Sequence, residues 1–216
     1  MMKGFIFDLD GVLADTAKYH YIAWKQLAAE IDITIDEAFN EQLKGISRQE
    51  SLERILAYGD KSSEFSASER FEMAERKNQH YVELLEELTP EDALPGVRDF
   101  LKAARKHNIP CGIASASKNA PFILDKLAIS DYFVGIVDPA ALTKGKPDPE
   151  IFIKAAQLLA IDPKEAIGFE DAQAGIDGIK ACGMYAIGIG EVEQLRGADR
   201  SVADLSELSI EELLRL

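Results

Sequence analysis

Short apolar runs alternate with helical stretches along the second half of the chain, and this alternation restricts the fold more than any other feature. Beyond Gly96, the strand-like runs are residues 109–114, 133–137, 166–169 and 185–188. Helical spacing of apolar residues occupies the stretches 97–106, 122–127, 149–159 and 174–181. Strands separated by helices in this way form βαβ units with right-handed crossovers, which build a parallel sheet. The sequence therefore predicts an α/β fold.

A first strand and a long helical segment precede this region. Residues 3–7 form an apolar run typical of a strand that is buried on both faces. The next stretches have helical spacing, at residues 21–28, 51–58 and 69–88. Prolines and a glycine then interrupt the pattern before residue 97. We expect one α/β domain, residues 1–15 plus 93–216, that is interrupted by a helical domain over residues 16–92.

Composition restricts the partners and the compartment. A formal net charge of −14 argues against a nucleic acid or an anionic membrane as the partner. No run approaches the roughly 18 apolar residues that a membrane-spanning helix needs. Cys111 and Cys182 are the 2 cysteines, and they suit small buried side chains in a reducing compartment better than a disulfide framework. We expect a cytoplasmic protein.

Two acidic residues follow the first strand. Side chains two positions apart on a strand point the same way, so Asp8 and Asp10 should project together from its carboxyl end. Like charges held together repel each other, and the pair persists only where a cation or a shared proton compensates it. A simple turn after the strand is the alternative; it accounts for Gly11 but not for two acids on one side.

Polar residues also follow the other strands, at the edge where open α/β sheets bind ligands. Residues 115–119 carry hydroxyls and an amide before a helix, which suits a phosphate cradle, with helix capping as the alternative. Lys146 precedes a proline that starts a helix, and a solvated surface lysine is its alternative reading. Glu170 and Asp171 form a second acidic pair, which could instead stabilise a helix amino terminus. Oxygen ligands without a His/Cys cluster select a hard cation such as Mg²⁺.

Taken in order, these motifs resemble those of the haloacid dehalogenase (HAD) superfamily of phosphotransferases. The matching residues are 8–12, Ser115, Lys146 and 170–171, and the helical segment resembles the superfamily's small α-helical cap. The resemblance implies a HAD-like core, a Rossmann-like three-layer parallel sheet, with the cap domain inserted after the first strand. It also implies an enzyme whose first aspartate attacks phosphorus and becomes an aspartyl phosphate.

The resemblance assigns roles to the core residues. Asp8 would be the nucleophile, Asp10 the general acid and base, and Ser115 and Lys146 would hold the transferring phosphate as further catalytic residues. One Mg²⁺ would be bound by Asp8, by the main-chain carbonyl of Asp10, and by Asp171, with Glu170 as a ligand or as a support for the ligands. Carboxylate attack on a phosphoryl group needs this neutralisation of the phosphate oxygens.

Segments of the insert resemble the superfamily's mutases for β-D-glucose phosphates, namely residues 15–20 with Trp24, 43–51 and 76–78, together with 115–119 of the core. Gly45 would let the backbone approach the sugar, and Arg48 would clamp a second phosphate. The substrate-binding residues expected from this resemblance are Leu9, Thr16, His20, Trp24, Lys44, Gly45, Arg48, Lys77, Ala116, Ser117, Lys118 and Asn119.

Alternatives remain for several of these side chains. His20 either senses cap closure together with Lys77 or packs on the cap helix. Trp24 is either part of the cap core or a platform for the sugar. Arg48 could pair with Glu50 or Glu53 on the surface, and the role of Lys44 is open.

The resulting hypothesis is an isomerase that interconverts β-D-glucose 1-phosphate and glucose 6-phosphate, with glucose 1,6-bisphosphate as primer and intermediate. The cap would close on a sugar phosphate and keep water from the aspartyl phosphate. A HAD sugar-phosphate phosphatase is the alternative enzyme, and a non-catalytic sugar-phosphate sensor is the alternative outside enzymes. A hinged cap suits a monomer.

Overall fold

The computed structural model describes residues 2–190 and 195–216 of the chain. The chain divides into two compact units, which are described separately. The core unit comprises Met1–Asp15 and Thr89–Leu216, and the cap unit comprises Thr16–Leu88. Among the described helices, none has the length and apolar character that crossing a membrane requires.

The core unit is built on a parallel sheet. The 6 strands found in the described residues lie in the order β3-β2-β1-β4-β5-β6, and each neighbouring pair is parallel. The strand bounds are β1 Gly4–Phe7, β2 Cys111–Ile113, β3 Gly135–Ile136, β4 Ala166–Glu170, β5 Tyr185–Ile189 and β6 Arg200–Val202. The first strand therefore lies in the middle of the sheet although it opens the chain, and its carboxyl end is flanked by those of β2 and β4.

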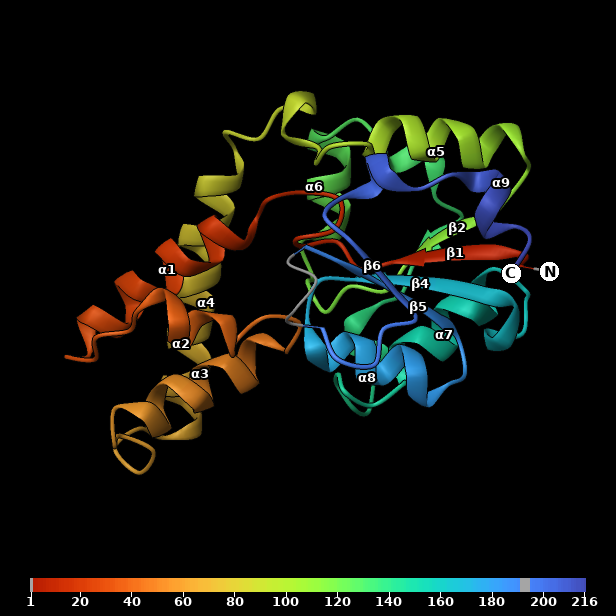
Figure 1. Ribbon diagram of the computed structural model, residues 1–216. Helices are drawn as coiled ribbons and strands as arrows, with labels where there is room; N and C mark the ends of the chain where they lie inside the picture. Colours follow the sequence, from red (N-terminus) through yellow and green to blue (C-terminus); the bar gives the residue numbers. More distant parts are fainter. Residues whose placement is uncertain (1, 191–194) are drawn as a thin grey trace. The chain divides into compact units, whose positions relative to one another are not determined.

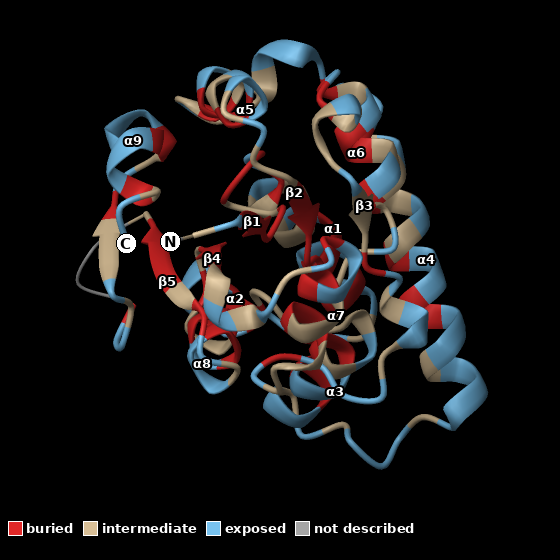
Figure 2. Ribbon diagram, turned by 90° about the vertical axis from the view of Figure 1, so that its right-hand side faces the viewer, coloured by how far each residue is buried: buried red, intermediate tan, exposed pale blue. Residues whose placement is uncertain are grey.

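Helices cover both faces of this sheet, with α5 and α9 on one face and α7 and α8 on the other (Figure 1). The helices of the core unit are α5 Val97–Lys106, α6 Ala120–Lys126, α7 Glu150–Leu158, α8 Gln173–Ala181 and α9 Ile210–Leu213. The central strands β1, β2 and β4 are buried along their whole length (Figure 2). This three-layer arrangement explains why their sequences are apolar without alternation, apart from Glu170 at the end of β4.

The residues of β1 alternate between two different cores. Phe5 and Phe7 lie in an aromatic cluster with Phe100 of α5 and Phe169 of β4, and the rings of Phe7 and Phe169 stack at 4.5 Å. Ile6 points the other way into an aliphatic cluster that includes residues of α7 and α8. Successive side chains of β1 therefore pack against the helices on opposite faces of the sheet. This packing fixes the end of the strand and with it the position of Asp8, the residue directly after Phe7.

The cap unit is helical. Its helices are α1 Ala17–Glu30, α2 Glu37–Glu41, α3 Arg48–Tyr58 and α4 Ala67–Leu85. Serine caps begin α3 and α4, because Ser47 accepts a hydrogen bond from the backbone of Glu50 and Ser66 forms a capping box with Glu69. Buried side chains of α4 recur every three or four residues, so one face of the helix packs inward (Figure 2).

The structure confirms the predicted α/β class with a parallel sheet. The short elements α2, β6 and α9 are among those that the sequence patterns did not indicate. The third predicted strand, residues 133–137, is a strand only over Gly135–Ile136. Short elements of this kind carry too few residues to show a period.

Candidate active site

Asp8, Lys146 and Glu170 form a buried charged cluster at the carboxyl ends of β1 and β4. The Nζ atom of Lys146 lies 2.6 Å from Oδ1 of Asp8 and 2.7 Å from Oε2 of Glu170. The three side chains are 6% exposed or less. The main chain holds Asp8 in place, since its amide donates to the carbonyl of Phe169 at 2.9 Å. One ammonium therefore joins the acids of two adjacent strands.

Burial and the neighbouring charges shift the pKa values of Lys146 and Glu170. Burial alone lowers the pKa of Lys146, but the carboxylates of Asp8 and Glu170 outweigh it and raise the pKa above its ordinary value. Burial raises the pKa of Glu170, and the neighbouring charge of Asp8 adds to this, while Lys146 opposes both. Lys146 is therefore a permanent cation in a site where the acids are forced together.

Asp171 completes an acidic group with Asp8 and Glu170. One carboxylate oxygen from each of the three lies within 4.8 Å of the others. Glycines make room for two of these acids. A Cβ at Gly11, whose φ is +80°, would lie 2.1 Å from Oδ2 of Asp171, and a Cβ at Gly175 would lie 1.9 Å from Oε2 of Glu170. Both positions therefore require glycine as long as the acids keep these places.

A chain of hydrogen bonds follows β2 and leads into α6. The Ser115 side chain accepts from the amide of Ser117 at 3.1 Å, and the Ser117 side chain accepts from the amide of Asn119 at 3.2 Å. Ser115 is 1% exposed. The amide of Ala114 donates to the carbonyl of Phe7 at 2.8 Å, which fixes the end of β2 beside the end of β1. The predicted hydroxyl cluster thus lies at the same edge of the sheet as Asp8.

The remaining core residues of the predicted site differ in exposure. The Leu9 side chain is 0% exposed, and its carbonyl accepts from the amides of residues 12–14, so this residue closes the turn after β1. Asp10 is partly exposed and forms an isolated bridge with Ala14. Ala116 is partly exposed, and Lys118 is exposed. The Leu9 side chain is therefore not available to contact a ligand.

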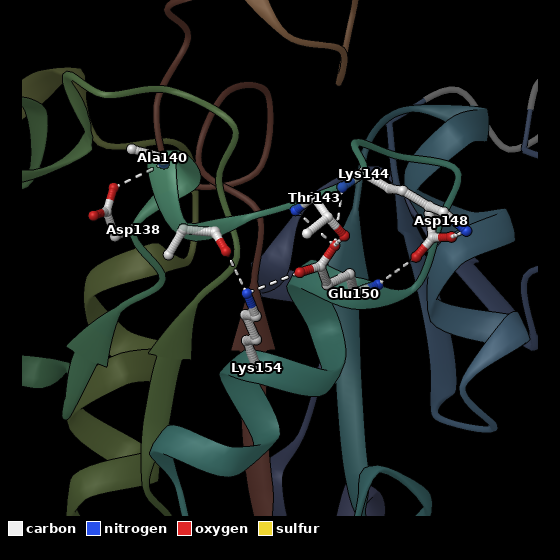
Figure 3. Close-up of polar contacts among 8 residues, drawn as sticks. Asp138, Ala140, Thr143, Lys144, Asp148, Glu150 and Lys154 are labelled. Carbon is white, nitrogen blue, oxygen red and sulfur yellow. Dashed lines mark hydrogen bonds and ion pairs between the residues drawn. The ribbon is translucent and has the colours of Figure 1, made fainter.

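Two residues of α7 that no sequence pattern indicated hold the loop that carries Lys146. Glu150, the first residue of α7, accepts hydrogen bonds from Thr143 and Lys144 of this loop (Figure 3). Phe152, also in α7, places its ring 5.1 Å from Nζ of Lys146. The sequence signal was a glutamate directly after Pro149, which by itself indicates only a helix start.

The cap unit contains its own buried polar group. Lys77 is 3% exposed, and its Nζ lies 4.6 Å from the ring centroids of both Trp24 and Tyr81. The same Nζ lies 2.7 Å from Nδ1 of His20, whose ring stacks on that of Tyr81. Burial, followed by the charges of Lys77 and Arg48, lowers the pKa of His20 well below its ordinary value. His20 is therefore neutral, and Nδ1 accepts from the Lys77 ammonium.

Trp24 is buried within the cap unit, and Thr16 is buried at the start of α1. Trp24 is 2% exposed and belongs to the cap's apolar cluster, which favours packing over a sugar platform as its role. Thr16 is 0% exposed, and its carbonyl accepts from the amides at the start of α1. Gly45 adopts a φ of +73°, which permits the tight bend just before α3.

The basic residues of the segment 43–51 form ion pairs in the cap. Nη1 of Arg48 lies 2.5 Å from Oε1 of Glu75, and not beside Glu50 or Glu53, the alternative partners expected from the sequence. The Arg48 side chain is 17% exposed, and burial lowers its pKa although Glu75 opposes this effect. Lys44 pairs with Glu41 at 2.8 Å. Arg48 thus emerges at the start of α3 with a carboxylate orienting it.

Comparisons with known proteins agree with this geometry. A sequence profile described as haloacid dehalogenase-like hydrolase matches residues 2–183. The chain is 50% identical over 210 residues to a β-phosphoglucomutase of Bacillus subtilis, covering 97% of this chain and 93% of that one. A phosphatase of phosphorylated carbohydrates from Thermotoga maritima is 29% identical over 86% of this chain and 84% of its own length.

A comparison with solved structures also finds a similar β-phosphoglucomutase. The crystal structure of a β-phosphoglucomutase from Clostridium difficile superposes with a TM-score of 0.97 at 47% identity, covering 100% of this chain and 96% of that one. The profile match spans both β1 with its acids and β4 with the second acidic pair. The chain belongs to the haloacid dehalogenase-like hydrolase family.

Proposed function

We propose that this protein is a β-phosphoglucomutase, an isomerase that interconverts β-D-glucose 1-phosphate and D-glucose 6-phosphate. The observation that carries the proposal is the buried Asp8–Lys146–Glu170 cluster in a chain that is 50% identical to a β-phosphoglucomutase over nearly its whole length. A carboxylate held against an ammonium at the end of a strand is suited to attack phosphorus, because both phosphate and carboxylate charges are balanced there.

The reaction assigns a role to each core residue. Phospho-Asp8 donates its phosphoryl group to the free 6-hydroxyl of glucose 1-phosphate, while the carboxylate of Asp10 accepts the proton of that hydroxyl. The bisphosphate then turns end for end. Asp8 takes the phosphoryl group from the 1-oxygen, and Asp10 returns the proton to the leaving oxygen. Lys146 and Ser115 hold the phosphoryl oxygens during both transfers.

The acidic group fits a Mg²⁺ ion. Asp8, Glu170 and Asp171 offer three carboxylates against the one ammonium of Lys146, and hard oxygen ligands of this kind suit Mg²⁺. The main-chain carbonyl of Asp10 remains a proposed further ligand. When bound, the ion supplies neutralisation of charge at the phosphoryl oxygens.

The cap unit supplies a second anion site in this proposal. A sugar with a phosphate at each end needs one site for the reacting phosphate and one for the other. Arg48 has the bidentate geometry for a phosphate, and its position at the amino terminus of α3 adds a favourable dipole. Lys44, Gly45, Lys77 and the segment 116–119 are proposed to contact the sugar phosphate.

A sugar-phosphate phosphatase is the second candidate, and the similarity to a phosphatase of phosphorylated carbohydrates favours it. The two reactions share the attack by Asp8 and differ in whether water or a sugar hydroxyl accepts the phosphoryl group. A phosphatase would release inorganic phosphate from glucose 1-phosphate without forming glucose 6-phosphate.

A coupled assay separates the candidates. The β and α anomers of glucose 1-phosphate are supplied in turn, with Mg²⁺ and the 1,6-bisphosphate primer, and both glucose 6-phosphate and inorganic phosphate are followed. We expect glucose 6-phosphate from the β anomer only, with little inorganic phosphate. Inorganic phosphate as the main product would refute the mutase and support the phosphatase.

The organisation of the protein is proposed on the same basis. We propose that the cap unit acts as a domain inserted after β1, with its end near residues 88–92. A monomeric protein in the cytoplasm is proposed as well, and the free thiols of Cys111 and Cys182 are suited to that reducing compartment. Sedimentation and cell fractionation test these two points.

A further inference from the structure

The segment that carries Lys146 is irregular, yet its lysine is placed within hydrogen-bonding distance of two carboxylates. We call residues 142–149, between the short helix Pro139–Ala141 and α7, the lysine loop. Within it, the amide of Asp148 donates to the carbonyl of Gly145 at 3.0 Å. A long side chain on a loop is positioned only as well as the loop backbone, so other residues must hold the lysine loop.

One carboxylate holds the beginning of this loop. Oε2 of Glu150 accepts three hydrogen bonds, from the amide of Thr143 at 2.9 Å, from the Thr143 hydroxyl at 2.6 Å and from the amide of Lys144 at 2.9 Å. Figure 3 shows this carboxylate at the start of α7, with the three donors converging on it. Glu150 therefore ties the loop to a regular helix two residues before Lys146.

Lys154 completes this attachment from the next turn of α7. Its Nζ lies 2.8 Å from Oε1 of Glu150 and donates to the carbonyl of Ala141 at 2.5 Å (Figure 3). The hydrogen bonds from Lys154 and then from Thr143 are the main reasons why the pKa of Glu150 falls to about 2. Glu150 therefore carries its charge at any pH where the enzyme would work.

The far side of the loop is fixed by packing. The ring of Phe152 lies against Lys146, and a Cβ at Gly178 of α8 would lie 3.3 Å from the carbonyl oxygen of Pro147. Glu150 and Phe152 come from the first turn of the same helix. The beginning of α7 thus contacts the lysine loop at Thr143 and Lys144 and at Lys146 itself.

We propose that Glu150 is a positioning residue of the phosphoryl-transfer site: its carboxylate fixes the backbone at Thr143 and Lys144, and through it the place of the Lys146 ammonium beside Asp8. This inference rests on the role proposed above for Lys146. The proposal means that catalysis depends on hydrogen bonds accepted by Glu150, although this side chain does not touch the substrate.

A simpler role for Glu150 would be favourable placement of a negative charge at the amino terminus of α7. The two roles differ in what glutamine should do. The Glu150→Gln variant loses the charge but keeps an oxygen that can accept from the two amides. The Glu150→Ala variant loses both. Positioning therefore predicts that glutamine restores part of the lost turnover, whereas a purely electrostatic role predicts that both variants behave alike.

The experiment compares these two variants with Lys154→Met and with a matched control, Glu165→Ala. Glu165 pairs with Lys3 on the surface at 2.6 Å, directly before β4 and therefore at the opposite edge of the sheet. Folding is checked by circular dichroism. Hydrogen exchange of the Thr143 and Lys144 amides is measured by NMR, and kcat and KM are measured for β-glucose 1-phosphate and for p-nitrophenyl phosphate.

We expect Glu150→Ala to raise exchange at both amides about tenfold or more. We expect its kcat to fall roughly tenfold to a hundredfold on both substrates, with a smaller change in KM. The exchange rates and the kcat of Glu150→Gln should lie between those of Glu150→Ala and the wild type. Lys154→Met should change the exchange rates and kcat in the same direction as Glu150→Ala, but by a smaller factor. Glu165→Ala should match the wild type in all of these measurements.

Unchanged exchange at the two amides, or faster exchange with the kcat of the control, would overturn the proposal. Equal losses in the glutamine and alanine variants would overturn it in favour of the electrostatic role. If Glu150→Ala does not fold, Lys154→Met decides alone, and its failure to change exchange or kcat would be the contrary result. The two proposals can fail separately. If the wild type forms no glucose 6-phosphate, the proposed mutase fails; if Glu150→Ala still hydrolyses p-nitrophenyl phosphate more slowly than the wild type does, the positioning role stands.

Discussion

Replacement of Lys146 by methionine should destabilise the core unit far more than a surface lysine substitution does. The Lys146 side chain is 1% exposed and contacts Asp8 and Glu170 at 2.6 and 2.7 Å, so the variant leaves two buried carboxylates without their cation. Removing one partner of a buried ion pair costs about 3–5 kcal/mol. With a urea m-value of about 2 kcal/mol/M, this loss lowers the unfolding midpoint by roughly 1.5 to 2.5 M.

The assay is urea unfolding in metal-free buffer, because a bound cation would replace part of the missing charge. Far-UV circular dichroism follows both units, and the fluorescence of Trp24, the 1 tryptophan of the chain, follows the cap unit. The control is Lys102→Met, since Lys102 is 63% exposed and pairs with Asp99 at 3.5 Å on the surface. A dichroism midpoint for Lys146→Met close to that of the control would refute the reasoning.

Three further predictions concern the cap, its pH dependence and a close contact. Arg48→Ala should lower kcat/KM for the glucose phosphate by roughly tenfold to a hundredfold, but leave hydrolysis of p-nitrophenyl phosphate unchanged; equal losses would contradict the clamp. The pKa of His20 is lower in the folded than in the unfolded protein, so stability should decline as the pH falls below 6.5, by up to about 1.4 kcal/mol per unit. His20→Gln should flatten this slope in urea unfolding followed by fluorescence, and an unchanged slope would assign it to other groups. Gly175→Ala should lower the free energy of unfolding by about 1–3 kcal/mol, because the added Cβ would overlap Glu170. The control is Gly145→Ala, whose added Cβ would meet nothing within 4 Å, and thermal unfolding should show a lower midpoint for Gly175→Ala only.

The sheet could be predicted from the sequence because its central strands are buried on both faces. Residues 4–7 and 166–169 are continuously apolar for that reason, and helices with an apolar stripe separate the later strands. The order of the strands was not predicted, since no local pattern records which strands pair. The strand Arg200–Val202 was missed because it has three residues and a charged first position.

The buried cluster could be predicted in outline for a different reason. Asp8 follows β1, Glu170 ends β4 and Lys146 lies before α7. The carboxyl ends of neighbouring parallel strands meet at one edge of the sheet. Glu150 and Glu75 could not be found in this way. Their partners, Thr143 and Arg48, lie in other segments, and the contacts depend on tertiary structure rather than on sequence spacing.

Transfer of a phosphoryl group to Asp8 is the central claim, and isotope labelling tests it most directly. The wild type and Asp8→Asn are mixed with Mg²⁺ and glucose 1,6-bisphosphate whose phosphoryl oxygens carry an oxygen isotope label, quenched in acid, digested and analysed by mass spectrometry. We predict label on the peptide that contains Asp8 in the wild type, none in the folded Asp8→Asn variant, and passage of the label to glucose 6-phosphate when unlabelled β-glucose 1-phosphate is added. Label on another residue, or turnover that persists in Asp8→Asn, would contradict the account.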